Sequence, residues 1–95
     1  MLHTLSHSPW QCDIDAMVRM LRDGDALLLL QDGVLAAMAG SRYVEILTNA
    51  PIKVFALKDD IEARGLTAQI STTIDVVSYT DFVNLAVQHT GHMNW

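Results

Sequence analysis

Four consecutive leucines, Leu27 to Leu30, constrain the fold of this chain more than any other feature of its sequence. They are followed directly by Gln31, Asp32 and Gly33. A strand covered on one side alternates apolar and polar residues, whereas an unbroken apolar run is typical of a strand buried on both faces of a parallel sheet. Because ligands in open α/β sheets bind beyond the carboxyl ends of the strands, residues 31–33 would lie at the edge where such sites occur.

The flanking sequence predicts three further strands and four or more helical segments. The predicted strands are residues 1–5, 52–57 and 74–77. The clearest helix begins at Ser8 and ends near Gly24. Ser8 can cap this helix, Pro9 fits its first turn, and Gln11 is placed to complete a capping box. Trp10 begins the apolar stripe of that helix, which continues with Ile14, Met17, Val18 and Leu21.

Shorter helical pieces are expected at residues 34–39, 42–50 and 59–64. A last helix is capped by Ser78 and runs to about His89, with Phe82, Leu85 and Ala86 on one face; Gly91 then ends it and leaves a short tail to Trp95. The expected fold is α/β, a mostly parallel sheet of about four or five strands with helices on both faces. Residues 1–95 form a single domain.

The composition is apolar for a small domain, with 51% hydrophobic and 18% charged residues. Either another chain covers part of the surface or the α/β core is richly packed, and the composition does not separate these explanations. The formal charge of −5 argues against direct binding of nucleic acid, which needs Lys and Arg to neutralise phosphates. No apolar run is long enough to span a bilayer and no secretory signal is present, so a cytoplasmic protein is expected.

Motifs that carry chemistry are absent. The nucleotide-binding motifs G-x-G-x-x-G and G-x-x-x-x-G-K-[ST] do not occur, so no cofactor is expected. The histidine pairs at positions 3 and 7 and at positions 89 and 92 lack metal-ligand spacing, so no metal is expected. Asp32 is the one carboxylate in a suggestive position, and its favoured role is to cap the next helix.

Cys12 is the only cysteine, which excludes an internal disulfide. In the first turn of the predicted helix its thiol pKa would be lowered, and a reactive thiolate is physically possible. The nearby Asp13 and Asp15 would oppose that charge, so the favoured interpretation is a small, partly buried residue of an amphipathic helix.

Several blocks of the sequence, taken together, resemble the DsrH/TusB family, and the resemblance runs from Met1 to Trp95. These blocks are residues 1–5, 8–10, 27–34, 49–54, 63–67 and 79–83. The resemblance implies the DsrE/F/H-like α/β fold. It also implies a non-catalytic subunit of a TusBCD complex, a heterohexamer in which TusC and TusD are the partners.

That complex would receive persulfide sulfur from TusA on a cysteine of TusD and pass it to TusE, for 2-thiolation of the wobble uridine of tRNA. Some DsrH-type relatives have a cysteine in the first helix that aligns near Met17 or Val18, so Cys12 does not match it and no catalytic residue is carried over. Trp10 and Trp95 are expected contact points, because interface cores favour aromatic side chains.

Two alternatives stay open. In the first, the chain is itself a persulfide carrier that uses Cys12. In the second, it is a small-ligand module that binds at the Gln31-Asp32-Gly33 edge, although no phosphate-cradling loop supports this.

Overall fold

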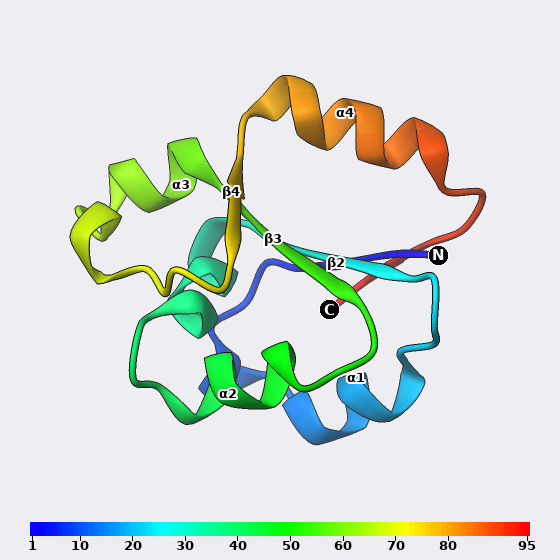
Figure 1. Cartoon of the computed structure of the whole chain (residues 1–95), viewed down its shortest axis with the longest axis horizontal. Coiled ribbons are helices and arrows are strands. Elements are labelled where there is room, and N and C mark those ends of the chain that lie inside the picture. Colours follow the sequence, from blue (N-terminus) through cyan, green and yellow to red (C-terminus); the bar gives the residue numbers. More distant parts are fainter.

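The computed structural model describes all 95 residues and contains one five-stranded sheet in which every strand is parallel to its neighbours (Figure 1). The strand order is β4-β3-β2-β1-β5. The strands are β1 (Leu2–Leu5), β2 (Ala26–Leu29), β3 (Lys53–Leu57), β4 (Asp75–Val77) and β5 (His92–Asn94). The predicted α/β class and parallel sheet are therefore confirmed.

The leucine run forms β2, the central strand of the sheet. All four residues of β2 are buried, and the strand pairs with β1 on one side and β3 on the other. An unbroken apolar segment is required at this position because its side chains meet helices above and below the sheet.

The two faces of the sheet are covered unequally. One face bears α1 (Ile14–Met20), α2 (Arg42–Thr48) and α3 (Lys58–Ala63), and the other bears only α4 (Tyr79–Gln88) (Figure 1). The connections β1-α1-β2, β2-α2-β3 and β3-α3-β4 all step in one direction across the sheet, whereas β4-α4-β5 steps back over three strands. Because parallel crossovers keep one hand, a reversal of direction puts α4 on the opposite face.

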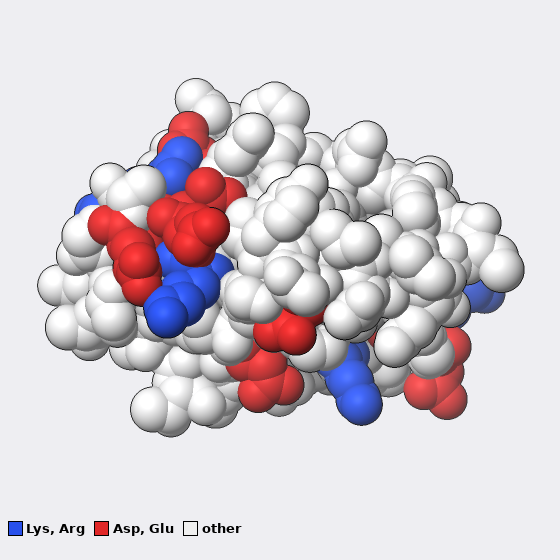
Figure 2. Space-filling model, turned by 90° about the horizontal axis from the view of Figure 1, so that it is seen from above, with Lys and Arg blue, Asp and Glu red and all other residues white.

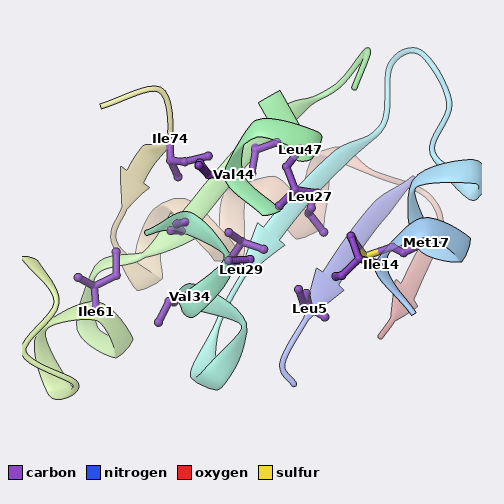
Figure 3. Close-up of a cluster of buried hydrophobic side chains, with 14 residues drawn as sticks. Leu5, Ile14, Met17, Leu27, Leu29, Val34, Val44, Leu47, Ile61 and Ile74 are labelled. Atoms are coloured by element: carbon purple, nitrogen blue, oxygen red, sulfur yellow. The ribbon is translucent and has the colours of Figure 1, made fainter. Parts of the chain in front are cut away.

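The main core lies under α1, α2 and α3 and contains 14 buried residues (Figure 3). Leu27 and Leu29 of β2 point into it, with Met17 from α1 and Leu47 from α2. The core under α4 has only three buried residues, which are Leu2, Ala26 and Leu28. Half-buried side chains such as Phe82 and Leu85 close it.

The first helix begins later than its sequence predicts. Residues Pro9–Gln11 form a separate 3₁₀ turn (η1), Cys12 is extended, and α1 starts at Ile14 with Asp13 as its N-cap. The Asp13 carboxylate accepts a hydrogen bond from the amide of Ala16, whereas Ser8 makes no capping hydrogen bond and its buried hydroxyl has no partner. The prediction of one helix capped by Ser8 is therefore wrong, because Asp13 supplies the functioning cap.

The C-terminal tail is also different from the prediction. Residues His92–Asn94 do not form a loose tail but add the fifth strand, β5, beside β1. The expected cap of the last helix is confirmed, since Ser78 and Asp81 form a reciprocal capping box. The helices predicted at residues 42–50 and 59–64 are confirmed as α2, which ends two residues earlier, and α3, which is shifted by one residue. The segment predicted at residues 34–39 is a 3₁₀ helix that starts earlier, η2 (Gln31–Ala37). No helix has the length and apolar character needed to cross a membrane.

Candidate functional site

The turn after β2 lies at the carboxyl edge of the sheet, as predicted, and is held by contacts within the chain. Gln31 adopts a φ of +51°, which is uncommon for a residue other than glycine. Its amide donates a hydrogen bond of 2.7 Å to Oδ2 of Asp60, in the first turn of α3. This contact fixes the strained residue and ties the end of β2 to the start of α3.

Gly33 is required at this edge by the close approach of β1. A Cβ atom at this position would lie 1.9 Å from the carbonyl oxygen of Leu5 and 2.7 Å from its carbonyl carbon. No side chain fits at such distances. The glycine of the Gln31-Asp32-Gly33 motif is therefore explained by packing.

Asp32 does not cap the following helix, contrary to the expectation. Its Oδ1 accepts hydrogen bonds from Nε and Nη2 of Arg64, at 3.0 and 2.9 Å, and η2 has no side-chain cap. Arg64 also donates through Nη1 to the carbonyl of Asp60 at 3.1 Å. Arg64 thus joins Asp32 and Asp60 in one network, and none of the clefts of the molecule is lined by residues 31–33.

Cys12 is half-buried between η1 and α1 and precedes the N-cap of α1. Cys12 therefore lies outside the first turn of the helix, although the sequence predicted it within that turn. Burial raises the pKa of the Cys12 thiol, and the neighbouring Asp13 carboxylate raises it further. The environment of Cys12 favours the neutral thiol over the nucleophilic thiolate.

The two tryptophans predicted as contact points have different surroundings. Trp10 is 64% exposed in η1 and lines a small cleft with Cys12, Arg42 and Tyr43. Trp95 is half-buried against the main core, and its carbonyl accepts a hydrogen bond from the amide of Ser6. Trp10 is thus freely accessible, whereas Trp95 also has a structural role.

A buried histidine joins the two ends of the chain, a feature that sequence reasoning missed. His3 lies in β1 and is only 1% exposed. Its Nε2 lies 3.0 Å from Oδ2 of Asp25, and its Nδ1 lies 3.2 Å from the indole nitrogen of Trp95. Because an indole N–H only donates, Nδ1 must accept, and Nε2 then carries the proton and donates to Asp25.

Asp25 is the acceptor at the centre of this network. Burial alone would raise its pKa, but hydrogen bonds from the N-terminal ammonium group, His3 and the Arg22 amide lower that pKa to about 2. The carboxylate therefore stays charged at neutral pH and fixes the amino ends of β1 and β2. The available signal in the sequence was a histidine in a strand bounded by leucines, which needs a partner if it is buried.

No group of three or more His, Cys, Asp or Glu side chains is arranged to hold a metal ion.

Comparisons with known proteins place the chain in a family. It is 70% identical to a protein named TusB from Enterobacter sp. (strain 638) and 60% identical to one named TusB from Escherichia coli (strain K12), and each match covers 100% of both chains. Among solved structures, protein Tm0979 from Thermotoga maritima is 26% identical, with a TM-score of 0.69 over 94% of each chain. The ychN protein of E. coli shares the fold at 14% identity, with a TM-score of 0.77 over 99% of this chain and 97% of its own. The family model described as "DsrH like protein" matches residues 7–91, and the chain belongs to that family.

Proposed function

We propose that this chain is a non-catalytic structural subunit of a cytoplasmic TusBCD sulfurtransferase complex. The observation that carries the proposal is the match to proteins named TusB, at 60% and 70% identity over the whole of both chains. Such a complex relays persulfide sulfur from TusA to TusE for 2-thiolation of the wobble uridine of tRNA. The partners of this chain are TusC and TusD, in a heterohexamer built as a dimer of trimers.

The state of Cys12 supports the assignment of the transfer chemistry to another subunit. A persulfide relay needs a thiolate that can attack a sulfur atom. In this chain both burial and Asp13 raise the pKa of the thiol. The sulfur-carrying cysteine is therefore expected on TusD, and Trp10 and Trp95 are proposed as contact residues.

The distribution of charge supports the absence of direct tRNA binding. The chain has 6 basic and 11 acidic residues, and the Arg64 side chain is paired with Asp32. A phosphate backbone is bound through unpaired Lys and Arg side chains. tRNA is therefore expected to contact other components of the relay.

A deletion strain complemented with variants tests the proposal. Loss of the gene is expected to abolish 2-thiolation of the wobble uridine, measured by mass spectrometry of tRNA nucleosides, and the wild-type chain restores it. Native mass spectrometry of the tagged chain is expected to show TusC and TusD in equal copies. Recovery of the chain alone as a monomer or homo-oligomer would refute the proposal.

The Cys12→Ser variant separates the structural subunit from a persulfide carrier. The expected result is full thiolation, because the hydroxyl replaces a thiol that holds no sulfur in this scheme. Loss of thiolation by a Cys12→Ser variant that still assembles with TusC and TusD would make Cys12 a carrier and overturn the non-catalytic role.

A further inference from the structure

The face of the sheet that bears α4 is incompletely covered. No residue of α4 is fully buried, although the helix is ten residues long and crosses the centre of the sheet. The core beneath it has three buried residues, against 14 on the other face. A five-stranded sheet covered by a single loosely packed helix leaves room for another layer of protein.

Exposed apolar side chains form a stripe along α4. Tyr79, Val83 and Val87 are four residues apart and are 60%, 43% and 81% exposed. Positions spaced by four lie on one side of a helix. This α4 stripe borders the side that packs on the sheet, which carries Phe82, Leu85 and Ala86; the Tyr79 ring meets the Phe82 ring edge-on, with ring centroids 5.8 Å apart.

Two clefts lie along the flank of α4 that carries Leu85 and Gln88, and neither is lined by a residue of the α4 stripe. Their volumes are about 540 and 310 Å³, and both are lined by Phe55, Leu85 and Gln88. At the end of α4, the exposed Met1 side chain lies against Gly91. The α4 stripe and these clefts are therefore separate features of the α4 face.

The α4 stripe is uncharged, whereas Asp23, Asp25 and Lys53 line the larger cleft and Asp81 lines the smaller one. No Lys or Arg follows Arg64 in the sequence, and Asp81 is the one charged side chain from Val76 to Trp95. Figure 2 views the molecule from the α4 side, with the charged groups gathered at one end and along the border and a broad uncharged area between them. Such a surface cannot neutralise phosphates, so its occupant is a protein with an uncharged, apolar face.

We propose that the α4 stripe is the surface on which a neighbouring subunit of the relay complex packs through an uncharged, apolar face of its own. This inference rests on the proposed function. A second copy would bring the same formal charge of −5, so a different chain is favoured over self-association.

The test compares two charged substitutions at exposed apolar positions on opposite faces. The full chain is co-expressed with TusC and TusD as the wild type, as Val87→Glu and as Met20→Glu; Met20 lies at the end of α1 and is 51% exposed. Val87→Glu is expected to weaken assembly more than about tenfold, because the new carboxylate would be buried without a partner. Met20→Glu is expected to assemble like the wild type.

A photo-cross-linker at Val83 in the otherwise unchanged chain gives an independent readout, with the same cross-linker at Met20 as its control. A cross-link from position 83 to TusC or TusD supports the inference. Cross-links from position 83 only to a second copy or to tRNA, or none at all, overturn it. If the wild type assembles with TusC and TusD and Val87→Glu does so equally well, the inference fails while the proposed function stands. If the wild type does not assemble, the proposed function itself fails.

Discussion

Replacing Gly33 by alanine is expected to destabilise the fold strongly, because the new methyl group would collide with backbone. The Cβ would lie 1.9 Å from the carbonyl oxygen of Leu5, whereas real Cβ contacts are essentially never shorter than 3.0 Å. The end of β1 and the turn after β2 would therefore have to separate by about 1 Å. Neither partner is a flexible side chain that could move aside.

The cost has two components. Forcing extra atoms into a packed region costs about 1–3 kcal/mol. The Leu5 carbonyl also accepts a hydrogen bond from the Leu30 amide at 3.0 Å, and its loss adds about 1 kcal/mol. The sum, about 2–4 kcal/mol, corresponds to a fall in Tm of about 10–30 °C for a domain of this size.

Thermal unfolding followed by circular dichroism measures the effect, with Gly40→Ala as the control. Gly40 has a φ of +80° but no atom within 4 Å of an added Cβ, so alanine there introduces backbone strain of about 1–2 kcal/mol without collision. Gly33→Ala is expected to be the less stable variant by about 1 kcal/mol or more. Equal stability of the two variants would refute the steric argument.

Three further variants test Asp25 and Trp95, two members of the network that joins the ends of the chain. Because the pKa of Asp25 is lowered from 3.8 to about 2, its charged form contributes stability above about pH 4 that is lost as the pH falls toward 2. Asp25→Asn should therefore lower the free energy of unfolding by about 1–2 kcal/mol at pH 7, after a discount for solvent screening. Urea unfolding measures this difference from the wild type, which should shrink as the pH falls from 4 to 2. A difference that stays constant over this range would contradict the role given to the Asp25 carboxylate. Trp95→Ala should weaken assembly with TusC and TusD. Trp95→Phe keeps an aromatic ring but loses the hydrogen bond to His3. This variant should assemble normally and lose only about 1 kcal/mol of folding stability. Unchanged assembly of Trp95→Ala would remove Trp95 from the interface.

The sequence predicted those elements whose signals are local. The leucine run predicts β2 because burial on both faces removes the polar alternation, and Ser78 predicts the start of α4 because its partner Asp81 is three residues away. The first helix was misplaced because Ser8 and Asp13 are both good caps. Local propensity does not choose between them, and only Asp13 is placed to accept the Ala16 amide.

Features that depend on distant residues could not be predicted. Strand β5 is short and contains two polar residues, and it exists because it pairs with β1, about 90 positions earlier in the chain. The network of His3, Asp25 and Trp95 likewise joins residues separated by 22 and 92 positions. The hydrogen bonds of Gln31 with Asp60 and of Asp32 with Arg64 also join distant positions. They take the place of the helix cap that the sequence predicted at Asp32.

The unequal faces of the sheet bear on the two explanations that the composition left open. A richly packed core exists, but it lies on the face of α1, α2 and α3. On the α4 face the helix buries no residue completely, and valine at position 87 is 81% exposed. A chain that needed apolar residues only for its own core would gain little from Val83 and Val87 at exposed positions of α4, where polar residues favour solubility. The packed core accounts for part of the apolar content, and the exposed apolar side chains of α4, the surface proposed to contact a second chain, account for another part.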